Sequence, residues 1–166
     1  ASQVAARAPA AGAGRWEVIF LLAVAVAEKP SRRSSASSVP DELTQTAMIT
    51  ALNRGVKVQS ITPGKHMDSK VVRGASRARW GPLLAAGGEM YEYEPSVYHC
   101  HVFMLDELLV SGASTHLAPR PLGLNGETNV SVYDEACSRQ QACSLRHALD
   151  KAERVARAQW EPDPLH

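Results

Sequence analysis

Histidine, serine and carboxylate side chains gather in one stretch of the chain, residues 98–134. The polar residues there that could do chemistry are His99, His101, Asp106, Ser114, His116, Asn125 and Glu127. His99 and His101 are two residues apart in an apolar, β-rich run, so both are expected on the same face of a strand. Proton-handling groups placed around core-like strands are typical of an active site for phosphate esters.

Phosphodiester chemistry is the first hypothesis for these residues. An imidazole can attack phosphorus to give a phosphohistidine, while a second acid protonates the leaving alcohol. The attacking ring needs a carboxylate on its other nitrogen to fix its tautomer, and Glu127 is the candidate for that task. The phosphate oxygens need hydrogen-bond donors, which Ser114, His116 and His101 could supply.

Three other interpretations stay open from the residues alone. The pair of histidines could bind zinc together with His116 or Cys100. Cys100, however, is expected on the opposite face of the strand, and the chain has neither an H-E-x-x-H motif nor a C-x-x-C pair. The two histidines could also be hydrogen-bonded polar residues at a sheet edge, or the domain could keep the architecture of an enzyme without its chemistry.

Bulk composition is that of an ordinary globular domain. The 166 residues are 45% apolar and 21% charged, and the formal net charge of +1 gives no overall argument for binding nucleic acid or a membrane. A basic patch is therefore local, on the arginine-rich segment 70–79. The three cysteines, Cys100, Cys137 and Cys143, have no paired spacing, which favours a reducing compartment over a disulfide scaffold.

The first forty residues contain one clear element. Residues 1–15 are rich in alanine and glycine and are expected to be disordered, so that one domain spans residues 16–166. A buried helix is expected over 16–29; its apolar run, 18–27, resembles the hydrophobic part of a signal peptide but is too short to span a bilayer. The segment 31–38, S-R-R-S-S-A-S-S, predicts a loop on composition alone.

Helices and strands alternate along the rest of the chain. Helices are expected over 40–53, over 68–86 with a kink or break at Pro82, from an N-cap at Asp134 to about 149, and over 153–160. Strands are expected over 56–61, 90–93, 98–105, 108–110 and 130–133. This alternation indicates an α/β layered fold.

The motifs in residues 20–134 resemble the C-terminal half of a bacterial cardiolipin synthase-like protein of the phospholipase D superfamily. The signature of that family is H-x-K-x4-D-x6-G-S-x-N, followed by an Arg and an N-x-E. Without gaps, it falls on His99, Asp106, Ser114, Arg120, Asn125 and Glu127. Upstream, V-P-D-E-L, R-G-V-K-V, P-G-K-H-M-D-S-K-V-V-R, S-R-A-R-W-G-P-L-L and Y-E-Y-E-P also resemble this family's second domain, in the same order.

The resemblance implies an α/β/α layered domain with a mixed central sheet, in which 31–38 is a strand rather than a loop. It implies a phosphatidyl-histidine that is passed to an alcohol, phosphatidylglycerol in the cardiolipin case, without a metal or other cofactor. His99 would be the nucleophile or the general acid/base, and Glu127 its orienting carboxylate. His101, Ser114, His116 and Asn125 would contact the phosphate. Asp106 belongs to the motif and is counted with the catalytic residues, although a role in capping the strand turn suits it better.

Departures from the signature predict weakened chemistry. The signature Lys is His101, the signature Asn is His116, and the Gly before Ser114 is Ala113. A misplaced donor costs about 2–4 kcal/mol of transition-state stabilisation, or roughly 10² to 10³ in rate. The alternatives are thus a silent pseudoenzyme or interaction domain, or a superfamily nuclease. The arginines of 70–79 alone support the nuclease, and a solvated helix face explains them equally well.

The family builds one active site from two such motifs, and this chain holds one. We therefore expect either a homodimer or an N-terminal half to complete the site. The expected substrate is a phospholipid, with peripheral membrane contact and no nucleic-acid partner. The expected location is the bacterial cytoplasm or the cytoplasmic face of the inner membrane.

Overall fold

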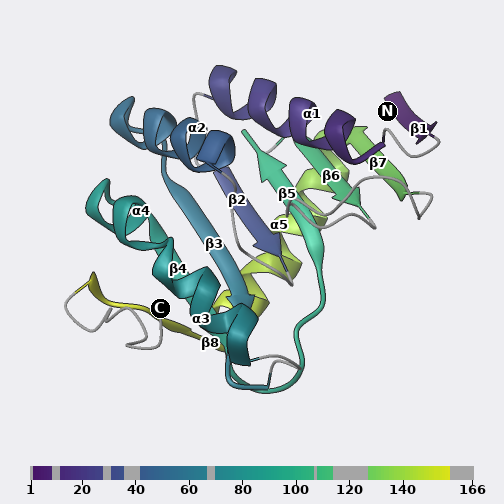
Figure 1. The fold of residues 1–166 in the computed structure, drawn as a ribbon. Helices are drawn as coiled ribbons and strands as arrows, with labels where there is room; N and C mark the ends of the chain where they lie inside the picture. Colours follow the sequence, from purple (N-terminus) through teal and green to yellow (C-terminus); the bar gives the residue numbers. More distant parts are fainter. Residues whose placement is uncertain are drawn as a thin grey trace.

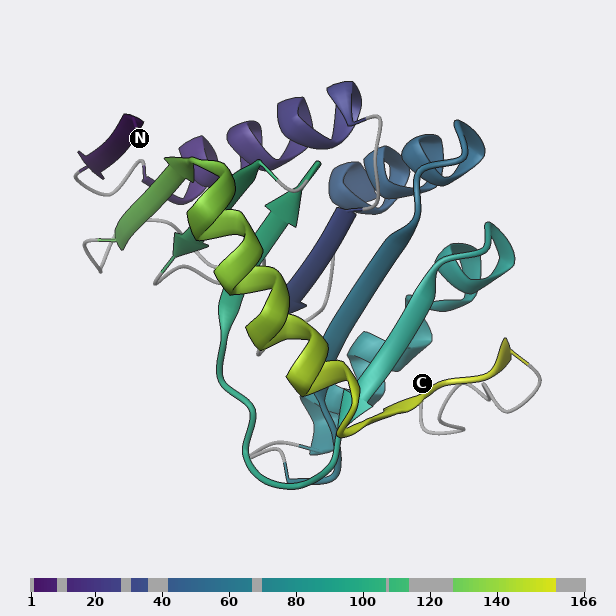
Figure 2. The same cartoon turned by 180° about the vertical axis from the view of Figure 1, so that it is seen from behind.

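A single mixed sheet with helices on both faces forms the domain (Figures 1 and 2). The structure is a computed structural model that describes residues 2–8, 12–27, 31–35, 42–66, 70–106, 108–113 and 127–157. Within these ranges the strand order is β1-β7-β6-β5-β2-β3-β4-β8. The predicted α/β/α layering with a mixed central sheet is confirmed.

Parallel and antiparallel strands divide the sheet. The strands are β1 (Ser2–Ala8), β2 (Ser31–Ser35), β3 (Val58–Pro63), β4 (Glu89–Tyr93), β5 (His101–Leu105), β6 (Leu109–Ala113), β7 (Glu127–Tyr133) and β8 (Ala152–Arg154). Strands β2, β3 and β4 are parallel to one another, and the remaining neighbours pair antiparallel. The carboxyl ends of the three parallel strands therefore meet at one edge of the sheet, which we call the carboxyl edge.

Helices cover both faces. Helices α1 (Gly12–Val26), α2 (Glu42–Asn53), α3 (Lys70–Ala78) and α4 (Gly81–Ala85) lie on one face, and α5 (Glu135–Leu149) lies on the other (Figures 1 and 2). Asp134 caps α5 by accepting a hydrogen bond from the Cys137 amide at 2.9 Å, as predicted. No helix in the described part of the chain is long and apolar enough to cross a bilayer.

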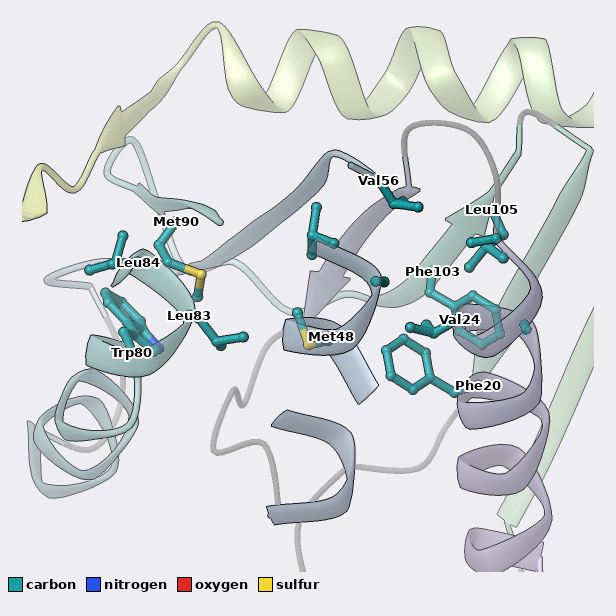
Figure 3. Packing of buried hydrophobic residues seen from close by; sticks show 14 of the residues in the cluster. Phe20, Val24, Met48, Val56, Trp80, Leu83, Leu84, Met90, Phe103 and Leu105 are labelled. Atoms are coloured by element: carbon teal, nitrogen blue, oxygen red, sulfur yellow. The ribbon is translucent and has the colours of Figure 1, made fainter. Parts of the chain in front are cut away.

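Alternate residues of the strands supply two cores. Phe103 of β5 packs edge-on against Phe20 of α1, with ring centroids 5.2 Å apart, in the larger core shown in Figure 3. Met104, the next residue of β5, belongs to a smaller core with Ala142 and Leu145 of α5. The prediction that the apolar run 18–27 forms a core helix is confirmed, because α1 buries its Phe20 and Val24 side chains.

The N-terminal segment differs from the sequence expectation. Residues 1–15 were expected to be disordered, but β1 pairs with β7 from Ser2↔Tyr133 to Ala8↔Glu127, and α1 begins at Gly12. An edge strand of this kind is held by backbone hydrogen bonds to the open side of its neighbour, so it needs no hydrophobic alternation in its own sequence. Composition therefore gave the wrong prediction here.

Two other segments are corrected. Composition predicted a loop over 31–38, but Ser31–Ser35 form β2 between β3 and β5, as the family resemblance implied. The helix expected over 153–160 is wrong in its described part, where β8 pairs with β4; residues 158–160 lie outside the described residues. The long helix over 68–86 is split into α3 and α4, with the break just ahead of Pro82.

Candidate active site

His99 and His101 lie at the carboxyl edge of the sheet. Strand β5 runs antiparallel to β2, with Ser35 opposite His101, so β5 begins at the edge where β2 ends. The chain that connects β4 to β5 runs along the same edge (Figure 1). In open α/β sheets, ligands bind outside the carboxyl ends of the parallel strands. The two histidines are therefore in the region where this kind of fold places its ligands.

The two imidazole rings contact each other. Their centroids are 5.1 Å apart and their planes meet at 80°, an edge-to-face arrangement. The His99 side chain is exposed, whereas His101 is 7% exposed. Strand β5 begins at His101 rather than at residue 98, so His99 lies two residues before it. The expectation that both histidines belong to one strand is therefore wrong for His99, but the two rings are in contact, and the pair combines an accessible imidazole with a buried one.

Strand pairing relates position 127 to the histidines. Phe103 lies opposite Ser111, which in turn lies opposite Ser131, and the two serine hydroxyls are 2.8 Å apart. Residues that pair directly share a face, as do residues separated by two or four positions along a strand. Position 127, four before Ser131, thus belongs to the same face as His101, two before Phe103. The strands β5, β6 and β7 are neighbours, so the two positions are on the order of 10 Å apart across the sheet.

Asp106 is not brought together with the histidines. It lies in the turn between β5 and β6, at the opposite end of β5 from His101, a separation of roughly 16 Å along the strand. Its φ of 49° is in the left-handed region, which aspartate tolerates better than most residues. The amide of Leu108 donates to the Leu105 carbonyl at 3.0 Å and closes this turn. The position suits a turn residue and does not suit contact with a substrate at His99.

Three of the expected phosphate contacts lie outside the described residues. Ser114, His116 and Asn125 belong to the segment 114–126, so their roles stay predictions. Strand β6 ends at Ala113, at the end of the β5–β6 pair where β5 begins. Among the described residues, no group of three His, Cys, Asp or Glu side chains could hold a metal ion.

An ion-pair network on α3 is a feature that sequence reasoning missed. Glu92 of β4, with a side chain 7% exposed, accepts hydrogen bonds from Arg73 at 2.9 Å (Nε) and 2.7 Å (Nη2) and from Arg77 at 2.9 Å (Nη1). Its hydrogen bonds raise the pKa of Arg73, and the Arg77 guanidinium also lies over the Trp80 ring, 5.7 Å from its centroid. Two arginines four residues apart, followed by a glutamate in a core strand, are the signal that could have found it. The segment 70–79 is thus not simply a solvated helix face.

Comparisons with known proteins identify the family of the chain. The family model for the cardiolipin synthase phospholipase D-like domain matches residues 27–149. The chain is 36% identical over 129 residues to cardiolipin synthase A of Erwinia tasmaniensis, covering 74% of this chain and 26% of that protein. It is also 36% identical over 122 residues to a cardiolipin synthase of Geobacillus thermodenitrificans, covering 72% of this chain and 24% of that protein. The chain therefore spans about a quarter of the length of these curated relatives.

A solved structure supports the architecture. The phospholipase D family member Nuc of Salmonella typhimurium matches with a TM-score of 0.76 at 18% identity, covering 93% of this chain and 98% of that one. At this identity the likeness shows the fold alone, while the family model, which covers most of the chain, shows the family. The chain belongs to the phospholipase D-like domain family of the cardiolipin synthases.

Proposed function

We propose that this domain is one half of a phospholipase D-type phosphatidyltransferase site that acts through His99. The observation that carries the proposal is the exposed imidazole of His99 at the carboxyl edge, in edge-on contact with the buried ring of His101. A nucleophile must be reachable by phosphorus and yet be held in a defined orientation. Contact with the buried His101 ring restricts rotation of the His99 ring. It leaves the His99 ring accessible to a substrate.

The proposed reaction has two displacements at phosphorus. An imidazole nitrogen of His99 attacks the phosphodiester, an N–P bond forms, and the P–O bond to the first alcohol breaks as that alcohol takes a proton from an acid. An acceptor alcohol then loses its proton to a base and attacks the same phosphorus, and the N–P bond breaks. If the facing half supplies the nucleophile, His99 supplies the acid and the base instead.

The remaining residues have assigned roles in this proposal. Glu127 orients the His99 ring, which requires a carboxylate at its second nitrogen. The support is that position 127 and His101 share a face of the sheet. Ser114, His116 and Asn125, with His101, would donate to the phosphate oxygens. Asp106 would act in the β5–β6 turn and not in the chemistry.

A silent domain of the same lineage is the second candidate. The observation that favours it is that the position of the signature lysine holds His101, a short and buried side chain. An imidazole can be neutral or charged near neutral pH, whereas the ammonium group of lysine is a full positive charge. The proposal is therefore a weakened enzyme, and a pseudoenzyme is the outcome if the remaining donors do not compensate.

The site needs a second half, because the family motif occurs once in this chain. A second copy of the domain, or the further sequence that the longer relatives contain, would supply it; the chain covers 24% to 26% of the first two relatives. Under this proposal the substrate is a phospholipid, met at the membrane surface on the cytoplasmic side. The nuclease alternative has less support, since the arginines of 70–79 are all that favours it, whereas the relatives at 36% identity are cardiolipin synthases.

Trapping of a phosphohistidine tests the proposal. The chain, alone at a concentration that allows self-association and together with a family N-terminal half, is incubated with ³²P-labelled phosphatidylglycerol and quenched in base, which preserves phosphohistidine. Peptide mapping is expected to place the label on His99. His99→Ala should abolish it, and His147→Ala should not, because His147 is exposed on α5, away from the site. Label on neither His99 nor the facing half, even in a His101→Lys/His116→Asn variant, would refute the enzymatic proposal.

A further inference from the structure

The two arginines of the network belong to the same edge of the sheet as His99. Glu92 lies opposite Thr62 in the β3–β4 pairing, one residue before β4 ends. Helix α3, which carries Arg73 and Arg77, lies beside the carboxyl ends of β3 and β4 (Figure 1). Strands β4 and β5 are separated by β3 and β2, so Glu92 and His101 are about 14 Å apart across the sheet.

The solvent side of this network is positive. The side chains of Arg73 and Arg77 are 33% and 22% exposed, whereas that of Glu92 is 7% exposed. Two cations and one anion leave a formal charge of +1, and the anion lies beneath the cations. The neighbouring Lys65–Glu94 pair, at 3.0 Å, adds no net charge. An anion that approaches this edge therefore meets guanidinium groups whose orientation the buried carboxylate fixes.

Exposed apolar side chains accompany the cations. Val71, two residues before Arg73 on α3, is 70% exposed, and Val97, two residues before His99, is 58% exposed. Valine side chains form neither hydrogen bonds nor ion pairs with a polynucleotide backbone. They suit the interfacial region of a bilayer, where apolar groups and cations face lipid head groups. The combination favours a phospholipid over a nucleic acid as the anion.

We propose that Arg73 binds the phosphate of the acceptor lipid's head group, so that it selects an alcohol that carries its own phosphate. This inference rests on the proposed function. An acceptor hydroxyl that attacks phosphorus at His99 would be joined through a glycerol to a second phosphate. The Nη1 atom of Arg73 takes no part in the hydrogen bonds to Glu92, so the Nη1–Nη2 edge of the guanidinium can donate two parallel hydrogen bonds to that phosphate. The positions of Glu92 and His101 are about 14 Å apart across the sheet. The arginine side chain, the histidine ring and a glycerol bridge together are long enough to cover that distance.

Glu92 is a positioning residue in this account. It acts through Arg73, whose Nε and Nη2 atoms it engages in a two-pronged hydrogen bond, and it holds Arg77 beside it. Loss of the carboxylate should therefore weaken acceptor binding without touching the reaction at His99. Removal of one hydrogen bond to a charged group lowers affinity about ten- to a hundredfold.

A binding experiment tests the inference whether or not the domain turns over. The ¹⁵N-labelled chain is titrated with sn-glycerol 3-phosphate, and the Nε–Hε resonances of Arg73 and of the neighbouring Arg77 are followed by NMR. The Arg77 resonance reports binding in the variants that lack Arg73. Glycerol, inorganic phosphate and a single-stranded oligonucleotide form separate arms. We expect saturable shifts with glycerol phosphate and none with glycerol. Arg73→Gln and Glu92→Gln should weaken binding about tenfold or more, Arg73→Lys should restore part of it, and Arg139→Gln should change nothing. Arg139 is the matched control, since it is 70% exposed on α5 and also pairs with a glutamate.

A transfer assay gives the second readout. Arg73→Gln should raise the KM for phosphatidylglycerol as acceptor about ten- to a hundredfold, while exchange of ¹⁴C-labelled glycerol into phosphatidylglycerol, which needs no acceptor phosphate, changes much less. Unaltered glycerol phosphate binding in Arg73→Gln would overturn the inference. Equal binding of inorganic phosphate would show an anion site without head-group recognition, and tighter binding of the oligonucleotide would replace the lipid with nucleic acid; both outcomes also overturn it. A failure of the proposed function would appear instead as missing label on His99 with binding at Arg73 intact.

Discussion

Replacing His101 by lysine is expected to speed the formation of the His99 adduct. The side chain at this position is 7% exposed and its ring lies 5.1 Å from that of His99, so a charge placed here acts on the reacting phosphate in a partly dry environment. A hydrogen bond from a charged donor contributes about 1.5–3 kcal/mol, against about 0.5–1.5 kcal/mol for a neutral one. The difference, roughly 1–2 kcal/mol, corresponds to a rate increase of about five- to thirtyfold.

The same substitution should cost stability. An ammonium group at a position that is 7% exposed loses hydration when no phosphate is bound, so the free energy of unfolding should fall by roughly 1–3 kcal/mol. The assay compares single-turnover labelling of residue 99 with urea unfolding for the same variant. His147→Lys, on the exposed side of α5, adds the same charge elsewhere and should change neither quantity much.

The refuting outcome is specific. A well-folded His101→Lys variant that labels residue 99 no faster than the parent would show that position 101 does not contact the phosphate. A slower reaction would show that the imidazole itself has a role that lysine cannot fill. Either result would remove the reading of His101 as a weakened substitute for the signature lysine.

Three further predictions concern the stability of the fold that positions the site. Phe103→Ala, at a ring that is 1% exposed, should lower the free energy of unfolding by about 3–5 kcal/mol in urea titrations. Asp134→Ala removes the cap that accepts from Cys137, and should cost about 1 kcal/mol by the same measurement. Burial alone would raise the pKa of Glu89, but hydrogen bonds, that from Gln59 being the strongest, lower it overall. Ionised Glu89 should therefore stabilise the fold fully above the ordinary glutamate pKa of about 4.3, and this contribution should be lost as the pH falls through the lowered pKa. In acid titrations of the free energy of unfolding, Glu89→Gln should abolish that loss.

Spacing in the sequence was enough to predict the part of the site that depends on local geometry. Two histidines separated by one residue in a β-rich run share a side in any extended conformation, and the rings of His99 and His101 are found in contact. The N-cap at Asp134 and the helix that follows were predicted for the same reason, because capping chemistry lies within a few residues.

Elements defined by their neighbours could not be predicted from their own composition. Strand β2 reads S-R-R-S-S and β1 reads S-Q-V-A-A-R-A, yet both are strands because adjacent strands offer them backbone partners. Only the family resemblance indicated β2. The Glu92 network was missed for a related reason, since α3 and β4 come together only through the fold.

The location of the phosphoryl group after one turnover is the most direct test of the central claim. A base-stable ³²P label on the peptide that contains His99, lost in His99→Ala and retained in His147→Ala, is the predicted result. A label on the facing half that still requires the His99 ring would assign His99 as the acid and base. Turnover that persists unchanged in His99→Ala would contradict the account.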